Sequence, residues 1–153
     1  MFKGEIVSIH IAPAPGVPMQ SVPEVHAVPG KGLEGDRYFD GTGTFWRAEP
    51  DRELTLIEVE AFEGMKRESQ LDLEPAEGRR NIVTRGVALN HLVGQEFQLG
   101  EVRVKGLGLC EPCKHLVKVS ARPSILGGLI HRGGLRAQIL TDGVIKVGDG
   151  VQA

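Results

Sequence analysis

The fold class is most clearly indicated by the run Glu96-Phe97-Gln98-Leu99-Gly100-Glu101-Val102-Arg103-Val104-Lys105. Its two ends are strand-like, and Leu99–Val102 has the composition of a tight turn, so the run predicts two paired strands. Asn81–Thr84 is a further strand-like segment upstream, and Gly86 and Gly94 separate it from the run. Short strands separated by glycine turns indicate a mainly β architecture.

The C-terminal part of the chain shows the same pattern. Leu135–Leu140 and Val144–Val147 are strand-like and flank Thr141-Asp142-Gly143. Asp-Gly between two such runs is a strong signal for a β-hairpin. We therefore predict that these two segments pair with each other.

The N-terminal part adds two further strands. Lys3–Ile11 alternates in character, which predicts a strand with Val7, Ile9 and Ile11 on one face. The proline-rich stretch Ala12–Pro23 predicts an irregular connection, and Val25–Val28 predicts a short strand.

The clearest helix follows the strand-like segment Leu54–Ile57, which is apolar and predicted to be buried. Glu58–Ser69 places Val59, Phe62 and Met65 near helical spacing, with charged residues on the opposite face. Taken together, the segments predict a mainly β, β-barrel-like fold with one or two helices.

Length and composition are those of an ordinary globular protein. At 153 residues the chain is long enough for one domain, so we expect a single domain over residues 1–153. Hydrophobic residues make up 41% and charged residues 25%, which excludes an intrinsically disordered chain. The 21 glycines and 9 prolines favour short elements and tight turns over long helices.

The net charge of −2 hides a basic segment. Residues 79–136 contain ten Lys/Arg against three Asp/Glu, a local charge of +7. A basic surface on an acidic protein suits a small anionic ligand or an acidic partner, whereas a general nucleic-acid binder is basic overall. Solvated side chains scattered over strand faces account for the segment equally well.

The sequence carries no signal for export or for membrane insertion. Glu5 is acidic where a signal peptide needs an apolar stretch. The uncharged run Ile6–Pro23 contains four prolines, which prevents a spanning helix. Two cysteines do not make a disulfide framework. We expect a cytoplasmic protein that binds neither membrane nor nucleic acid.

One glycine motif matches a nucleotide-binding pattern in letters only. Gly30-Lys31-Gly32-Leu33-Glu34-Gly35 has the form G-x-G-x-x-G. In a dinucleotide site such glycines open a helix that binds the pyrophosphate. Pro29 precedes the motif here and no apolar helical period follows it, so a glycine turn is the better interpretation.

Cys110-Glu111-Pro112-Cys113 is the sharpest chemical motif. It follows the apolar run Val104–Leu109 and precedes Lys114–Val117, which predicts a helical turn. A thiol at a helix N-terminus with basic neighbours is expected to favour its thiolate. Sulfur transfer, disulfide exchange and soft-metal ligation all require that form.

Three further roles remain open for the two cysteines. Thioredoxin-type chemistry places C-x-x-C after a strand of a βαβ unit, whereas here the motif comes late and strands follow. A structural zinc needs four ligands, so His131 or a second chain would have to complete the pair. Two buried thiols that pack as small hydrophobic groups are the simplest case.

Two basic motifs could bind an anion. Arg79-Arg80-Asn81 opens a predicted strand, and paired arginines there form either an anion clamp or solvated edge-strand charges. His131-Arg132-Gly133-Gly134 combines arginine with bare backbone amides, which suits an oxyanion or phosphate. A loop whose glycines only turn the chain accounts for the second motif equally well.

The order of these motifs resembles the MOSC family, the domain found at the C-terminus of molybdenum-cofactor sulfurases and in small stand-alone proteins. The resemblance covers nearly the whole chain and is weakest over residues 11–25. It rests on Gly35–Arg37, Leu54–Glu58, Gly78–Gly86, Leu92–Phe97, Cys110–Cys113, His131–Gly134 and Gly143–Asp149.

The resemblance implies a β-barrel-like fold and binding of molybdenum cofactor (molybdopterin), an anionic pterin dithiolene with a terminal phosphate. It implies that Cys113, which has the aliphatic Leu116 soon after it, carries sulfur as a persulfide or ligates molybdenum. Cys110 is an additional thiol that would resolve a Cys113 persulfide as a disulfide or have no role. The candidates for binding the cofactor are Arg80, Asn81, His131 and Arg132.

Full sulfurases make the persulfide in a separate pyridoxal-phosphate domain, for which this chain has no room. No pyridoxal phosphate is therefore expected here, and a partner such as a cysteine desulfurase would supply the sulfur. Two other functions stay open. One is a cofactor-holding module that reduces N-hydroxylated compounds with electrons from a partner reductase. The other is a non-enzymatic interaction domain with structural cysteines.

Overall fold

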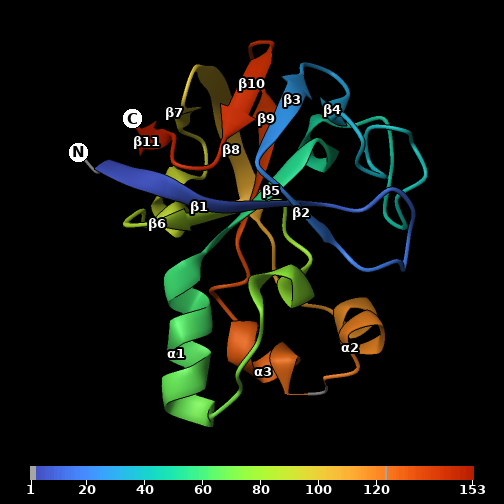
Figure 1. Ribbon diagram of the computed structural model, residues 1–153, viewed down its shortest axis with the longest axis vertical. Coiled ribbons are helices and arrows are strands. Elements are labelled where there is room, and N and C mark those ends of the chain that lie inside the picture. Colours follow the sequence, from blue (N-terminus) through green and yellow to red (C-terminus); the bar gives the residue numbers. More distant parts are fainter. Residues whose placement is uncertain (1–2, 123) are drawn as a thin grey trace.

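Seven strands of the computed structural model, which describes residues 3–122 and 124–153, close into a barrel (Figure 1). Their order around the barrel is β1-β6-β5-β9-β8-β7-β11, and β11 pairs back onto β1. β5 and β6 are parallel, and the other neighbours are antiparallel. The barrel strands are β1 (Lys3–Ile11), β5 (Leu54–Glu58), β6 (Ile82–Arg85), β7 (Glu96–Leu99), β8 (Val102–Leu109), β9 (Leu135–Ile139) and β11 (Gly150–Gln152).

A second, three-stranded sheet with the order β10-β3-β4 accompanies the barrel. It consists of β3 (Glu24–Val28), β4 (Gly32–Leu33) and β10 (Gly143–Lys146). The short strand β2 (Gln20–Val22) pairs with the end of β1 and leads into this sheet. The mainly β, barrel-like architecture predicted from the sequence is confirmed.

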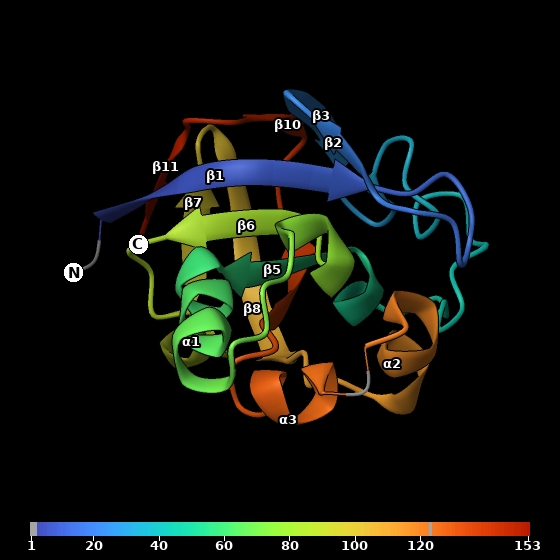
Figure 2. The same cartoon turned by 60° about the horizontal axis from the view of Figure 1, so that its bottom comes forward.

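The helices gather at one end of the barrel (Figures 1 and 2). The described residues form three α-helices, one more than expected, and none of their helices is long and apolar enough to cross a membrane. The α-helices are α1 (Val59–Ser69), α2 (Lys114–Ser120) and α3 (Ile125–Leu129), and the 3-10 helices are η1 (Pro50–Arg52), η2 (Pro75–Gly78) and η3 (Leu89–Leu92).

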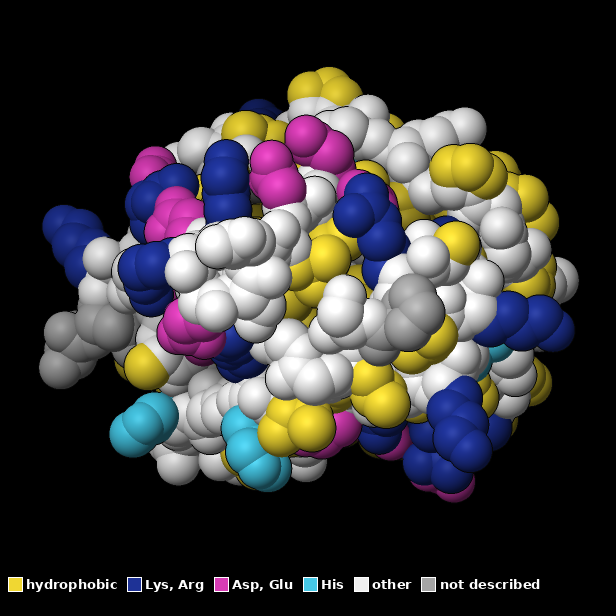
Figure 3. Space-filling model, turned by 90° about the horizontal axis from the view of Figure 1, so that it is seen from below, with side chains coloured by type: hydrophobic (Ala, Val, Ile, Leu, Met, Phe, Trp, Pro, Cys, Tyr) yellow, Lys and Arg dark blue, Asp and Glu magenta, His cyan; other side chains and the backbone are white. Residues whose placement is uncertain are grey.

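Two apolar clusters stabilise this arrangement, because each barrel strand presents alternate residues to opposite sides. Leu56 of β5 points into the barrel interior, whereas its neighbour Ile57 points outward to the helices. Phe62 and Met65 of α1 pack in the second cluster, as the spacing of that segment predicts. Figure 3 views this helical end and shows apolar side chains in the hollow between the helices.

The hairpin predicted at Leu99–Val102 is confirmed. β7 and β8 are antiparallel, and Leu99 and Val102 are register partners across the turn. Gly100 has φ +61°, a left-handed conformation that glycine adopts without steric cost. The turn is also anchored, because the Gly100 N–H donates to the Gly150 carbonyl of β11.

The hairpin predicted around Asp142-Gly143 is wrong. β9 pairs with β5 and β8, whereas β10 pairs with β3. The N–H groups of Leu140 and Thr141 both donate to the Arg103 carbonyl, so the chain is held at the start of β8 before it turns away. The turn residues bend the chain as expected, but tertiary contacts choose a different partner strand.

The face predicted for β1 is also wrong. The register with β6 shifts between Ile6 and Ser8, which marks a β-bulge. The bulge places Ile6 and Ile9 in the barrel interior and directs Val7 to the helical cluster. Strict alternation of Val7, Ile9 and Ile11 therefore fails, because one extra residue reverses the orientation of those that follow.

The motif over residues 30–35 forms turns and a two-residue strand, as the glycine-turn interpretation predicts. Gly30, Gly32 and Gly35 have φ of +78°, +126° and +90°. A Cβ at Gly32 would lie 2.8 Å from the Glu53 carbonyl oxygen, so this position also needs glycine for close approach. No helix follows the motif, and β4 stands where a dinucleotide site would need one.

Glu53 connects this loop to the barrel and should make stability depend on pH. Its Oε1 accepts hydrogen bonds from the N–H groups of Gly30 and Ile139, and burial raises the pKa of the Glu53 carboxyl. A raised pKa in the folded state adds stability below the unfolded pKa, and that stability is lost as pH rises. Glu53→Gln keeps the acceptor and removes the charge.

We expect Glu53→Gln to be more stable than the parent at pH 7 by about 1 kcal/mol. The difference should disappear as the pH is lowered towards 4, where the Glu53 carboxyl becomes protonated. Urea unfolding from pH 4 to 8 measures it, with Glu24→Gln on an exposed position as the control. If the free energies of unfolding of the parent and Glu53→Gln differed by the same amount at every pH, Glu53 would not be the source of the pH dependence.

Candidate functional site

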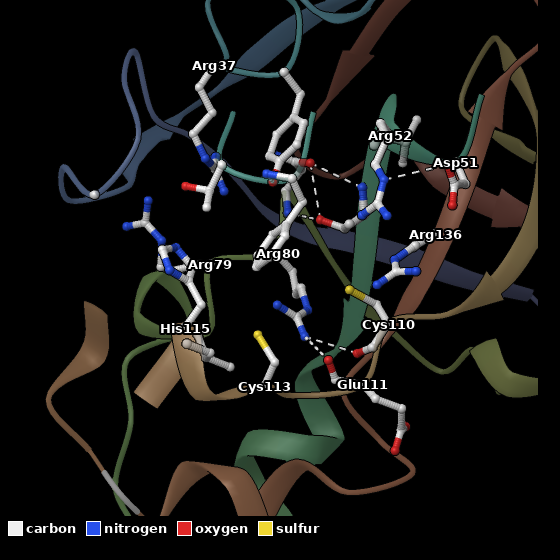
Figure 4. A pocket seen from close by; sticks show the side chains of 18 residues that line it. Arg37, Asp51, Arg52, Arg79, Arg80, Cys110, Glu111, Cys113, His115 and Arg136 are labelled. Carbon is white, nitrogen blue, oxygen red and sulfur yellow. Dashed lines mark hydrogen bonds and ion pairs between the residues drawn. The ribbon is translucent and has the colours of Figure 1, made fainter. Parts of the chain in front are cut away.

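A cavity that is partly open to solvent lies between the outer face of the barrel and α2, with about 790 Å³ of space when its open mouth is included (Figure 4). Its walls come from the loop that ends at η1, the start of β5, the junction of η2 and β6, the segment between β8 and α2, and the start of β9. The C-x-x-C motif and the Arg79-Arg80-Asn81 motif, which are far apart in the sequence, meet in this cavity.

Both cysteines line the cavity and both are free thiols. Cys110 is buried, whereas Cys113 is exposed and forms the N-cap of α2. The helix predicted after Cys113 is confirmed over Lys114–Ser120. Figure 4 shows both sulfur atoms directed towards the cavity. Cys113 is thus the thiol that solvent and a ligand reach more easily.

Arg80 holds in place the segment between β8 and α2, residues 110–113, which we call the cysteine-bearing loop. Its Nε donates to the Gly133 carbonyl at 2.7 Å and its Nη2 donates to the Cys110 carbonyl at 3.0 Å. Its Nη1 lies 3.3 Å from the Gly78 carbonyl. The guanidinium that the sequence suggested for anion binding therefore uses its N–H groups on main-chain carbonyls, and it adds positive charge to the cavity wall.

Asn81 is similarly committed to the fold. Its Oδ1 accepts from the N–H and the hydroxyl of Thr55 at 3.1 and 3.2 Å, and its Nδ2 donates to the His10 carbonyl at 3.1 Å. These bonds join β5, β6 and β1 in the wall of the cavity. Asn81 thus borders the cavity while its amide group already has protein partners.

His131 and Arg132 do not line the cavity in the described part of the chain. The His131 N–H donates to the Glu111 carboxylate at 3.1 Å, and the His131 side chain is 84% exposed. Arg132 pairs with Glu68 of α1 at 2.8 Å. Both residues support the cysteine-bearing loop or α3 from outside, and neither reaches the thiols.

Five arginines face the cavity against two acidic residues, Asp51 and Glu111. Among the described residues, no carboxylate lies within 4 Å of the guanidinium of Arg79, Arg80 or Arg136. The sequence analysis singled out Arg79 and Arg80 but not the other three, which are Arg37, Arg52 and Arg136. Arg37 stood in the Gly35-Asp36-Arg37 motif and Arg136 in the basic segment, whereas no motif marked Arg52, and nothing in the sequence joined the three.

Arg37 and Arg79 form what we call the paired-arginine end of the cavity. Arg37 is buried and pairs with Asp36 at 3.0 Å, while Arg79 donates to the Val17 carbonyl at 2.7 Å. Burial and, secondly, the positive charge of Arg37 lower the pKa of Arg79. A half-buried guanidinium whose charged form is disfavoured in this way is stabilised by an anion.

Aromatic rings border the cavity near this end. The rings of Phe45 and His115 make an edge-to-face contact with centroids 5.3 Å apart, which joins the loop before η1 to α2. The Arg37 guanidinium stacks over the ring of Tyr38 at 4.9 Å. All three rings line the cavity, so a flat heterocycle has surfaces to pack against.

The sequence left three other roles open for the C-x-x-C motif: thioredoxin-type redox chemistry, a structural zinc site and buried packing thiols. β8 is antiparallel to both β7 and β9, so the βαβ context of thioredoxin-type redox sites is missing around the cysteines. Within residues 3–122 and 124–153, no group of three or more His, Cys, Asp or Glu side chains is placed to hold a metal ion. Cys110 is buried, as packing thiols are, but Cys113 is not.

Comparison with solved structures identifies the same fold elsewhere. The YuaD protein from Bacillus subtilis superposes with a TM-score of 0.80 at 16% identity, covering 99% of this chain and 97% of that one. YiiM from Geobacillus stearothermophilus gives 0.72 at 16% identity over 97% and 74% of the chains. YiiM from Escherichia coli gives 0.68 at 20% identity over 99% and 69%.

The sequence has no significant match among curated proteins. A family model described as the MOSC domain matches residues 33–152, which include the two cysteines and most of the cavity wall. The resemblance drawn from the motifs is thereby confirmed over most of the chain. The chain belongs to the MOSC domain family.

Proposed function

We propose that the cavity binds molybdenum cofactor and that Cys113 carries sulfur as a persulfide or ligates the metal. One observation carries the proposal: an accessible thiol shares a single cavity with the paired-arginine end. An anionic pterin dithiolene needs this combination, because a guanidinium binds phosphate and a thiolate binds a soft metal. When bound, the cofactor supplies a redox-active metal that exchanges terminal oxygen or sulfur.

The residues present fit such a group. Arg37 and Arg79 would hold the terminal phosphate, and the rings of Tyr38, Phe45 and His115 would pack against the pterin. The phosphate would accept hydrogen bonds from N–H groups of Arg37 and Arg79 that the Asp36 carboxylate and the Val17 carbonyl leave free. The aromatic rings exclude water from one face of the ligand.

The remaining candidates act through the wall of the cavity. Arg80 and Asn81 hold the cysteine-bearing loop and the three barrel strands beside it, so they would shape the site. His131 and Arg132 lie outside the cavity, so the proposal assigns them no contact with the cofactor. In this proposal residues 1–153 act as one cytoplasmic domain that receives sulfur or electrons from a partner protein.

Elemental analysis of protein purified without oxygen tests the proposal. Molybdenum, tungsten and zinc are measured together with pterin fluorescence after oxidation. We expect molybdenum and pterin at about one per chain. The content of both should be lower in Arg79→Gln. Zinc alone, or neither metal nor pterin with no persulfide on Cys113, would overturn the proposal.

Reduction of N-hydroxylated compounds is the second candidate, and the space beside Cys110 favours it. Gly108 lies opposite Arg136 in the register of β8 and β9, and a Cβ at Gly108 would meet no atom within 4 Å. The Gly108 side of Arg136 is therefore open, which leaves space next to this end of the cavity for part of a substrate. Turnover that depends on an added reductase would separate this function from sulfur carriage.

A further inference from the structure

Arg136 is, with Arg52, one of the two cavity arginines that the proposed function leaves without a role. Arg136 is the second residue of β9 and lies between Leu135 and Ala137, whose side chains are buried in the barrel interior. The side chain of Arg136 is therefore on the outer face of the strand, where it is half-buried. Figure 4 shows its guanidinium turned into the cavity next to Cys110.

The Arg136 guanidinium has no protein acceptor within residues 3–122 and 124–153. Arg37 donates to a carboxylate, and Arg79 and Arg80 donate to main-chain carbonyls. Arg52 makes only an ion pair with Asp51, at 3.6 Å. A half-buried guanidinium with five N–H donors is stabilised most by an anionic oxygen acceptor. The position of Arg136 thus calls for an anion from outside the chain.

A second cation stands at the same side of the cavity. The Nε of Arg52 is buried without a hydrogen-bond partner, because the nearest carboxylate oxygen, on Asp51, is 3.6 Å away. Figure 4 shows Arg52 and Arg136 together with Cys110, across the cavity from the paired-arginine end. The cavity therefore has two separate cationic ends with a thiol at each side of its floor.

The strands around Arg136 leave room for a small ligand group. Its register partners are Thr55 in β5, whose short side chain is hydrogen-bonded to Asn81, and Gly108 in β8, which has no side chain. Directly paired residues share one face of a sheet, so both border the guanidinium. A Cβ placed at Gly108 would meet no atom within 4 Å, so the Gly108 side of Arg136 is open.

We propose that Arg136, assisted by Arg52, binds an anionic oxygen group of the substrate, such as a carboxylate, and places it beside the Cys110 thiol. The inference rests on the proposed function, in which the pterin phosphate takes the paired-arginine end and leaves Arg136 for a second anion. The cavity therefore selects small substrates that carry an oxyanion over neutral ones of the same size.

Alkylation of Cys110 by iodoacetate, a carboxylate, and by the neutral iodoacetamide tests the subsite. Each rate is divided by the rate for glutathione, and peptide mass spectrometry separates Cys110 from Cys113. We expect the normalised preference for iodoacetate at Cys110 to fall about tenfold in Arg136→Gln. It should be partly retained in Arg136→Lys and unchanged in Arg85→Gln, whose side chain pairs with Glu63 elsewhere.

Thermal unfolding covers the case in which buried Cys110 reacts with neither reagent. At equal ionic strength, sodium sulfate should raise Tm above its value in sodium chloride, and less in Arg136→Gln than in Arg85→Gln. An equal alkylation preference at Cys110 in these two variants overturns the proposal. If Cys110 is unreactive, an equal sulfate-dependent rise in Tm in the two variants overturns it. Both measurements use the chain without pterin or metal, so they fail or succeed independently of cofactor binding.

Discussion

Cys113→Ser is expected to abolish retention of molybdenum or of persulfide sulfur, with a loss of at least about 100-fold. A serine hydroxyl is neither a soft metal ligand nor able to form a persulfide. Cys113 is the exposed thiol at the N-cap of α2 and faces the cavity, so no other group replaces it there. Metal content and persulfide content per chain are the measurements.

Cys110→Ser is the matched comparison, and its effect should be below about tenfold. Cys110 is buried, and its main-chain groups rather than its thiol carry the contacts to Arg80 and Gly134. Thermal unfolding of both variants checks that neither loss comes from misfolding. Equal losses in the two variants would mean that the roles of Cys110 and Cys113 have been assigned wrongly.

Gly134→Ala is expected to destabilise the fold by about 3 kcal/mol or more. Gly134 has φ +113°, which side-chain-bearing residues rarely adopt, and a Cβ there would overlap the Leu56 carbonyl oxygen of β5. Since the Gly134 carbonyl accepts the Cys110 N–H, relief of that overlap would also displace the cysteine-bearing loop. Urea unfolding measures the loss, and alkylation of Cys113 reports the displacement.

Gly127→Ala is the control for this substitution. Gly127 lies in α3, where it is exposed, and a Cβ there would meet no atom within 4 Å. Alanine in a helix is favoured over glycine by roughly 0.5–1 kcal/mol, so this variant should be as stable as the parent or slightly more so. If Gly134→Ala and Gly127→Ala unfolded at the same urea concentration, the segment around Gly134 would have accommodated the Cβ without strain.

Local patterns in the sequence were sufficient for the elements with strong signals. The helix at Val59–Ser69 and the turn at Leu99–Val102 depend on contacts a few residues apart, so their spacing and turn chemistry predicted them. The order of motifs also identified the MOSC family, which the match over residues 33–152 confirms. Both cysteines were singled out as chemistry-bearing residues, and both line the cavity.

The pairing of the strands and the meeting of the arginines depend on the tertiary structure. The Asp142-Gly143 turn has hairpin chemistry, yet β10 joins β3 because long-range contacts outweigh the local preference. A bulge in β1 reverses its faces, and such a register shift leaves no periodic mark in the sequence. Arg37, Arg52 and Arg136 come from three separate segments, so no spacing rule could join them. The segment that carries Arg37 and Arg52 packs against β9, where the Ile139 N–H donates to Glu53, and this packing brings the three arginines to one cavity.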